Sequence, residues 1–204
     1  MTMRSNRTRL NGAATLLLSL LLAGGAGAAS ATERGGPAFN AGVFDPPAMA
    51  PEFSLPGSDG AEVTLKRYRG RLVLMSFGYT TCVAVCPITL ATLADVRRDL
   101  GEAADAVQVI FVTVDPERDD ASRMKDYLQA FDPGFVGATG TPETLVAMRQ
   151  SYGATATKQV TPDGYVMDHT SSVYLIDRAG KLRALMPYGH SADDFVHDIR
   201  LLTK

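Results

Sequence analysis

The hydrophobic positions downstream of residue 51 follow two different spacings. Continuous apolar runs at 71–77 and 107–115 have the length and composition of strands that are covered on both faces. A shorter run at 134–139 predicts a further strand. Between and after these runs, apolar residues recur on one face of amphipathic segments, which predicts helices over 87–100, 119–131, 141–153 and 191–202.

Turn signals add two hairpins to this pattern. Residues 52–65 carry short alternating runs around Ser58-Asp59-Gly60, and residues 171–188 turn at Arg178-Ala179-Gly180. Strands that alternate with helices predict an α/β fold with helices on both faces of one sheet. The order of the elements is that of a thioredoxin-like fold, with a central mixed sheet and an N-terminal β-hairpin.

Residues 1–31 have the features of a secretory signal peptide. Arg4, Arg7 and Arg9 precede an uncharged apolar stretch, which ends in small residues and an Ala-Ser-Ala cleavage site at 29–31. The apolar stretch is just long enough to span a bilayer, so an uncleaved N-terminal membrane anchor is the alternative. In both cases we expect an exported, periplasmic protein that meets the membrane only through this segment.

The composition of the remaining residues limits the possible domain organisation and partners. Residues 32–51 are rich in Pro, Gly and Ala without periodicity, which predicts a flexible linker in front of a folded domain over 52–204. The net charge of −2 argues against nucleic acid as a partner, because nucleic-acid binding usually needs a basic face. The hydrophobic content of 46% is sufficient for one core in a domain of this size.

The only two cysteines of the chain, Cys82 and Cys86, directly follow the predicted strand at 71–77. Open α/β sheets place their functional sites at the carboxyl ends of their strands. Pro87 is favoured at the first position of a helix, which predicts that Cys86 is the N-cap of the helix that follows. The helix dipole is then expected to favour the thiolate form of Cys86.

Three roles for the pair are compatible with this position. A structural disulfide closes only a five-residue loop, and the chain-entropy model assigns so short a loop about 2 kcal/mol. The second role is a redox-active Cys82–Cys86 disulfide, although thioredoxin-like oxidoreductases space their cysteines by two residues and face them with a proline, which is missing between Pro162 and Pro187. The third role is a metal site, because two thiolates are soft ligands that select Cu(I).

A metal site needs a third ligand, and the chain has three histidines. His190 and His197 belong to the last predicted helix, where a surface position is the simplest explanation of both. His169 lies just before the strand predicted at 173–177, at the place where thioredoxin-like proteins carry the proline that faces their cysteines. We therefore expect the His169 imidazole within bonding reach of both sulfur atoms.

Three segments together resemble the Sco/SenC family of copper-binding assembly factors for cytochrome c oxidase. They are FGYTTCVAVCP at 77–87, VTVDPERDD at 112–120 and DHTSSVYLID at 168–177. The resemblance extends from about residue 50 to the end of the chain. It implies that the two cysteines and the histidine of these segments, which are Cys82, Cys86 and His169, bind copper.

The resemblance also implies a biological role. A member of this family is a metallochaperone rather than an enzyme, and it delivers copper to the binuclear copper centre of cytochrome c oxidase subunit II. The cargo is Cu(I), with Cu(II) as the second possibility, and an upstream periplasmic protein is the expected copper donor. The alternative function is that of a thiol–disulfide oxidoreductase, which reduces the cysteines of that subunit or of another exported protein.

Three carboxylates lie in the matching segments. Asp168 is expected either to orient the neighbouring histidine through its second ring nitrogen or to be solvated. Asp115 and Asp119 are expected to support the site, to join a docking surface, or to form an ordinary turn and helix cap. Thr81 and the apolar stretch at 83–85 stand where many family members have polar residues, which changes the surface that a partner meets.

Overall fold

The computed structural model describes residues 38–203. The predicted signal peptide or anchor at 1–31, the first residues of the predicted linker and Lys204 lie outside the described residues. None of the helices within 38–203 combines the length and the hydropathy that a membrane crossing requires.

Helices and strands alternate along the described chain. The strands are β1 (Gly42–Met49), β2 (Ser54–Pro56), β3 (Glu62–Thr64), β4 (Leu72–Gly78), β5 (Val107–Thr113), β6 (Val136–Ala138), β7 (Ala156–Thr161), β8 (Gly164–His169), β9 (Val173–Ile176) and β10 (Lys181–Met186). The α-helices are α1 (Val85–Leu100), α2 (Ala121–Gln129), α3 (Pro142–Ser151) and α4 (Ala192–Leu202). There are also two short 3₁₀ helices: η1 (Lys66–Tyr68) lies between β3 and β4, and η2 (Gly101–Ala106) lies between α1 and β5.

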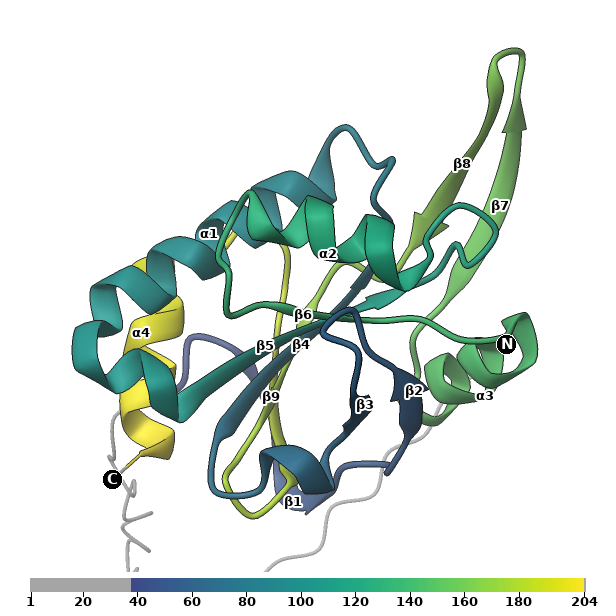
Figure 1. Cartoon of the computed structure of the whole chain (residues 1–204). Coiled ribbons are helices and arrows are strands. Elements are labelled where there is room, and N and C mark those ends of the chain that lie inside the picture. Colours follow the sequence, from purple (N-terminus) through teal and green to yellow (C-terminus); the bar gives the residue numbers. More distant parts are fainter. Residues whose placement is uncertain (1–37, 204) are drawn as a thin grey trace, which may run out of the picture. The chain divides into compact units, whose positions relative to one another are not determined.

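The central sheet is mixed and has the strand order β1-β10-β9-β4-β5-β6 (Figure 1). Strand β4 pairs in parallel with β5, and β5 pairs in parallel with β6. Helices α1 and α2 make these two crossovers, as parallel neighbours require. Strands β9, β10 and β1 complete the sheet as antiparallel neighbours. The predicted α/β fold with a central mixed sheet is confirmed, as is the N-terminal hairpin, formed by β2 and β3.

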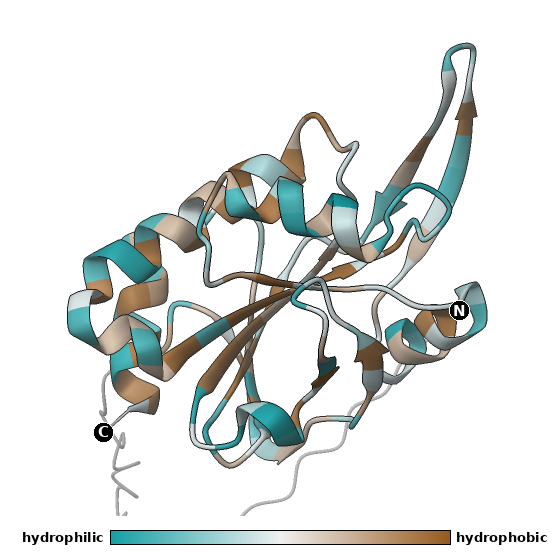
Figure 2. Cartoon of the chain, in the orientation of Figure 1, coloured by the Kyte–Doolittle hydropathy of each residue, from teal (hydrophilic) through white to brown (hydrophobic). Residues whose placement is uncertain are grey.

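The two central strands are apolar because they are covered on both faces. Every residue of β4 and β5 is buried, and these strands are among the most apolar parts of the ribbon (Figure 2). On one face the Phe111 ring lies 6.2 Å from that of Tyr127 in α2, and on the other the Phe77 ring lies 6.3 Å from Tyr152 at the end of α3. Side chains therefore cover both faces of these two strands, and β4 leads into the cysteine loop.

The prediction of a linker over 32–51 is wrong for its second half. Residues Gly42–Met49 form β1 and pair with β10 at both ends, with a shift of register between Val43 and Ala48. All eight residues of β1 are exposed, so the strand has no buried alternation that would identify it in the sequence. Pro46 and Pro47 lack an N–H group and are tolerated because β1 is an edge strand.

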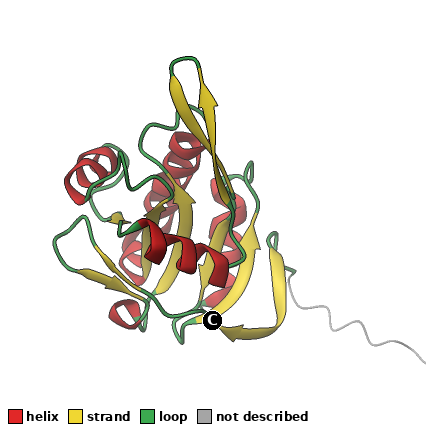
Figure 3. Cartoon of the chain, turned by 90° about the vertical axis from the view of Figure 1, so that its right-hand side faces the viewer, coloured by secondary structure: helices red, strands yellow, loops and turns green. Residues whose placement is uncertain are grey.

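A third hairpin, β7–β8, was not predicted. Its strands pair only with each other and project from the domain (Figure 3). Most of its side chains are exposed or half-buried, so it lacks a strong apolar run. The turn itself carried a signal, because Pro162-Asp163-Gly164 is typical of a tight hairpin connection. This hairpin brings His169 to the cysteines.

Side chains cap helices α3 and α4, and the start of α1 corrects a prediction. Thr141 caps α3 in front of Pro142, and Ser191 and Asp194 form the capping box of α4. Helix α1 begins at Val85, two residues before the predicted start, so Cys86 lies inside the first turn and is not the N-cap.

Candidate metal centre

The cysteine loop begins where β4 ends, at Gly78. A Cβ atom at this position would lie 2.5 Å from the Phe111 ring and 2.9 Å from the Cys86 sulfur. Both distances are shorter than a carbon atom tolerates, so the backbone passes the sulfur at a distance that only glycine allows. Beyond Gly78 the chain makes a short loop and enters α1, with Cys82 in the loop and Cys86 in the helix.

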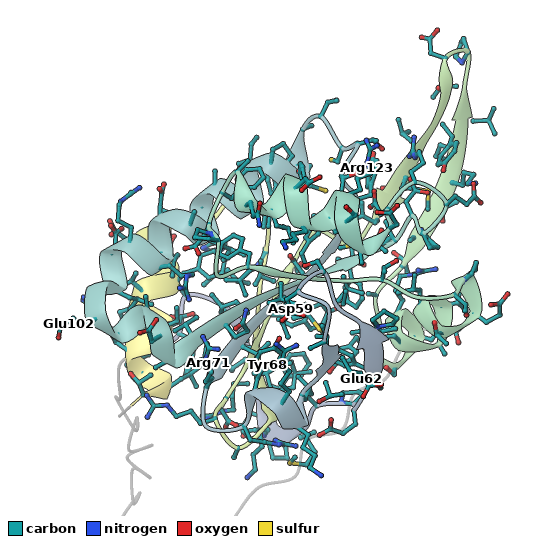
Figure 4. The ribbon with its side chains drawn as sticks, viewed as in Figure 1. Asp59, Glu62, Tyr68, Arg71, Glu102 and Arg123 are labelled. Carbon is teal, nitrogen blue, oxygen red and sulfur yellow. The ribbon has the colours of Figure 1, made fainter. Side chains whose placement is uncertain are left out.

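The buried carboxylate of Asp119 fixes the course of this loop. It accepts hydrogen bonds from the Thr80 backbone N–H at 3.0 Å, from the Thr80 hydroxyl at 2.5 Å and from the Thr113 hydroxyl at 2.7 Å. Arg123 of α2, labelled in Figure 4, donates to the Thr80 hydroxyl at 2.8 Å. A buried carboxylate with these donors holds the loop in one conformation. Of the roles expected for Asp119, support of the site is therefore the one that its contacts fit.

His169 is the last residue of β8, so it reaches the site from a different part of the chain than the cysteine loop. Its Nδ1 lies 2.9 Å from the Thr170 carbonyl oxygen, which can only accept, so Nδ1 carries the proton. The Nε2 lone pair is therefore free to act as a ligand. The Tyr79 ring packs edge-on against the imidazole, with 5.7 Å between the ring centres, and helps to hold the ring plane.

The three predicted ligands meet. The Cys86 sulfur lies 3.5 Å from His169 Nε2, and the ligand atoms of Cys82, Cys86 and His169 all lie within 4.8 Å of one another. This distance is small enough for one ion to contact all three atoms. Two sulfurs and one imidazole nitrogen form a soft donor set, which suits Cu(I) and excludes hard cations such as Mg²⁺.

The two thiols differ in exposure and acidity. Cys86 is buried, and burial raises the pKa of its thiol well above the ordinary value. Cys82 is half-buried; desolvation raises its pKa, but the backbone N–H groups of Cys86, Ala84 and Val85 outweigh this effect and hold the pKa below its ordinary value. The start of α1 therefore favours the thiolate of Cys82, and the prediction that it favours Cys86 is wrong.

One side of the site is open. A pocket of about 380 Å³ is bordered by Cys82, His169, Met167 and Tyr79. Val83, which follows Cys82 in the chain, is 95% exposed, so the cysteine loop presents an apolar side chain to solvent. A partner therefore reaches Cys82 before it reaches the buried Cys86.

The other predicted residues separate into two groups. Asp115 is buried and accepts a hydrogen bond from the Tyr165 hydroxyl at 2.7 Å, which ties it to the hairpin that carries His169. The Asp168 side chain is exposed and forms no hydrogen bond within 38–203, and the Thr170 carbonyl binds the ring nitrogen that Asp168 was expected to bind.

The remaining histidines lie outside the site. His190 contacts Asp194 and His197 contacts Asp198, both through helix α4. Tyr79 and Tyr165, which were not predicted, support the site through ring contacts with His169 and Arg118. A tyrosine in an apolar or alternating segment gives no signal that separates a supporting role from an ordinary place in the core.

Known proteins are similar to this chain in sequence and in fold. The SCO1/SenC family model matches residues 43–204. The mitochondrial SCO2 homologue of Mus musculus is 35% identical over 153 residues, which cover 73% of this chain and 60% of that protein. The chain therefore spans about three fifths of the mouse relative's length.

Two solved structures are similar over nearly their whole length. Bradyrhizobium japonicum ScoI with copper bound is 38% identical, with a TM-score of 0.70, and the match covers 76% of this chain and 99% of that one. Arabidopsis thaliana ScoI with copper bound is 30% identical, with a TM-score of 0.72, and the match covers 76% and 98%. The similarity in sequence and in fold shows that this chain belongs to the SCO1/SenC family.

Proposed function

We propose that this protein binds one copper ion through Cys82, Cys86 and His169 and passes it to an acceptor protein. The observation that carries the proposal is the convergence of the three ligand atoms within 4.8 Å, at a donor set that suits Cu(I). Copper in the Bradyrhizobium and Arabidopsis relatives supports the choice of metal.

Transfer proceeds by exchange of ligands. An acceptor thiolate enters through the open pocket and forms a bond to copper, while the bond from copper to the half-buried Cys82 breaks. Cys86 and His169 keep the ion until a second acceptor ligand replaces them. The ion keeps its oxidation state throughout, and no copper is released into solution.

The acceptor that family membership favours is cytochrome c oxidase subunit II, at its binuclear copper centre. We place the protein in the periplasm, exported by residues 1–31 and, if that segment is retained, anchored by it. An upstream periplasmic protein supplies the copper. The domain that carries the site runs from β1 to α4, preceded by a linker that ends before Gly42.

A second function is favoured by the unequal thiols. The Cys82 sulfur lies at the start of α1, 3.5 Å from the Cys86 backbone nitrogen, and is the accessible thiol. Its thiolate could attack a disulfide of the acceptor, and the Cys86 thiolate would then release the mixed disulfide. The acceptor leaves with two thiols, and this protein with a Cys82–Cys86 disulfide.

One pair of assays separates the two functions. Protein loaded with one equivalent of Cu(I) is mixed with the reduced copper domain of subunit II under anaerobic conditions, and the copper in each protein is measured after separation. We expect transfer from the wild type and weaker copper binding in His169→Ala, which keeps only the two sulfur ligands and loses part of its copper during the separation. The proposal fails if the wild type retains no copper while copper-free wild type and His169→Ala reduce the oxidised acceptor equally well.

A further inference from the structure

The hairpin that carries His169 is not part of the central sheet. Strands β7 and β8 hydrogen bond only to each other, and neither pairs with another strand of the described chain. His169 pairs with Ala156 at the base of this hairpin, and no strand of the central sheet pairs with it. Its distance to the cysteines therefore depends on the side chains that attach the hairpin to the domain.

Tyr165, four residues before His169 on the same face of β8, attaches the hairpin to the segment at 115–118, beside a second contact in which Lys158 of β7 pairs with Glu117 at 2.7 Å. Its hydroxyl donates to Asp115 at 2.7 Å, and its backbone carbonyl accepts from Arg118 Nη1 at 3.2 Å. The Arg118 guanidinium also lies 3.7 Å from the centre of the Tyr165 ring. Arg118 and Asp115 are themselves joined by an ion pair, so the three side chains form one unit.

The segment at 115–119, which binds Tyr165, also contacts the loop that carries the cysteines. Asp119 fixes Thr80 by two hydrogen bonds, and Arg118 lies 5.6 Å from the ring centre of Tyr79, which packs against His169. Residues 115–119 thus contact the cysteine loop at one end and the histidine hairpin at the other. No other segment of the described chain combines these two sets of hydrogen bonds.

We infer that residues 115–119 form a clamp that sets the distance from His169 to the two cysteines, with Tyr165 as its release point. When the Tyr165 contacts break, the hairpin moves and takes His169 away from the sulfurs. The inference rests on the proposed copper site and adds positioning residues to it. It adds a step to the proposed transfer: after an acceptor thiolate has replaced Cys82, opening of the clamp removes the nitrogen ligand and lets a second acceptor ligand take the ion from Cys86.

One feature of the closed clamp lowers the cost of opening it. Arg118 Nη2 is buried and has no hydrogen-bond partner within 38–203. A buried donor without an acceptor destabilises the state that buries it. Opening the hairpin exposes this nitrogen to water, which offsets part of the loss of the Tyr165 contacts.

The test compares two tyrosine-to-phenylalanine variants. Tyr165→Phe removes the hydroxyl that binds Asp115, and Tyr152→Phe removes a hydroxyl that donates to the Pro51 carbonyl at 2.6 Å, outside the clamp. Cu(I) affinity is measured by competition with a chromogenic chelator. We expect Tyr165→Phe to weaken binding about three- to tenfold, as the loss of one hydrogen bond allows, and Tyr152→Phe to leave it unchanged.

A double variant separates positioning from general damage. If the clamp acts through His169, Tyr165→Phe has no further effect on affinity in the His169→Ala background. An equal loss in both backgrounds, or unchanged affinity in Tyr165→Phe alone, overturns the inference.

Hydrogen exchange tests the clamp in the absence of copper. In the copper-free protein, Tyr165→Phe should speed amide exchange in residues 164–169, and Tyr152→Phe should not. If the wild type binds no copper but this difference is found, the proposed function fails and the clamp stands. If copper binds and depends on His169 while exchange is the same in Tyr165→Phe and wild type, the clamp is wrong and the proposed function stands.

Discussion

At the scale of single residues, the two cysteines have different environments although they lie four positions apart. Cys82 receives backbone N–H groups at the start of α1 and is half-exposed. Cys86 is buried against the sheet beneath the Phe111 ring and Gly78. Cys82 is therefore the more accessible and more acidic thiol, and in the proposed transfer Cys86 is the cysteine that keeps the ion longer.

This difference predicts the order of alkylation in the reduced, copper-free protein. Iodoacetamide should modify Cys82 well before Cys86, because the thiolate is the reactive form and Cys82 has the lowered pKa and the greater exposure. The rate at Cys82 should rise with pH, with its midpoint below the pKa of a free cysteine. Peptide mass spectrometry after timed quenching measures both rates, with Cys82→Ala as the control. Equal rates at the two cysteines would contradict this description of the site.

At the scale of elements, the site depends on a loop that is held by one buried carboxylate. Asp119 binds three donors from two segments, and its side chain is fully buried. The sequence showed only an aspartate after a strand, a position typical of any turn. Its role depends on Thr80, which is distant in the sequence and contacts Asp119 only in the folded protein.

Asp119→Asn should both destabilise the protein and weaken copper binding. The amide loses the charge that three donors share, and hydrogen bonds to charged groups contribute about 1.5–3 kcal/mol each. We expect a loss of about 2–3 kcal/mol in the free energy of unfolding, measured with urea, and a weaker Cu(I) affinity. The control is Asp126→Asn, which makes the same change at an exposed position of α2 and should have little effect. A variant with wild-type stability and affinity would show that Asp119 is dispensable.

The capping box of α4 predicts a dependence of stability on pH. Hydrogen bonds from the Ser191 backbone and hydroxyl lower the pKa of Asp194 in the folded protein. A carboxylate with a lowered folded pKa stabilises the protein above its unfolded pKa, and this contribution is lost as the pH falls through the folded value.

The stability difference between wild type and Asp194→Asn should therefore be constant near neutral pH and shrink below about pH 4, the ordinary range of an aspartate. Urea unfolding at a series of pH values measures it. Asp193→Asn changes a neighbouring carboxylate that does not belong to the capping box and should show less of this dependence. An equal difference at pH 3 and pH 7 would argue against the cap.

At the scale of the whole molecule, the buried sheet supports the site without taking part in it. Leu74 is fully buried in the middle of β4. Leu74→Ala should lower the free energy of unfolding by about 2–5 kcal/mol, the range observed for such truncations in protein cores. Cu(I) affinity, measured where the variant is still folded, should stay within about twofold of wild type. A large loss of affinity in a folded variant would mean that the core and the site are coupled.

Much of this architecture could be predicted from the sequence, because local patterns and tertiary packing agree in the buried strands β4 and β5 and in the capped helices α3 and α4. Strand β1 could not, since an exposed edge strand with two prolines is stabilised by its pairing with β10. The β7–β8 hairpin was not predicted either, because it lacks an apolar alternation. Its contacts with the domain include those of Tyr165 with Arg118, which no local pattern indicates.

The ligand set was predictable and its surroundings were not. Two cysteines and a histidine carry their chemistry in their residue types, and the fold order places them together. The partner of the second His169 nitrogen depends on backbone geometry, which favoured the Thr170 carbonyl over the neighbouring carboxylate of Asp168.

X-ray absorption spectroscopy of the Cu(I)-loaded protein tests the central claim most directly. We predict one copper per chain, with two sulfur neighbours and one nitrogen neighbour. His169→Ala should lose the nitrogen, and Cys82→Ser should lose one sulfur. A wild-type spectrum that contains sulfur neighbours alone, or that is unchanged in His169→Ala, would contradict the three-ligand site.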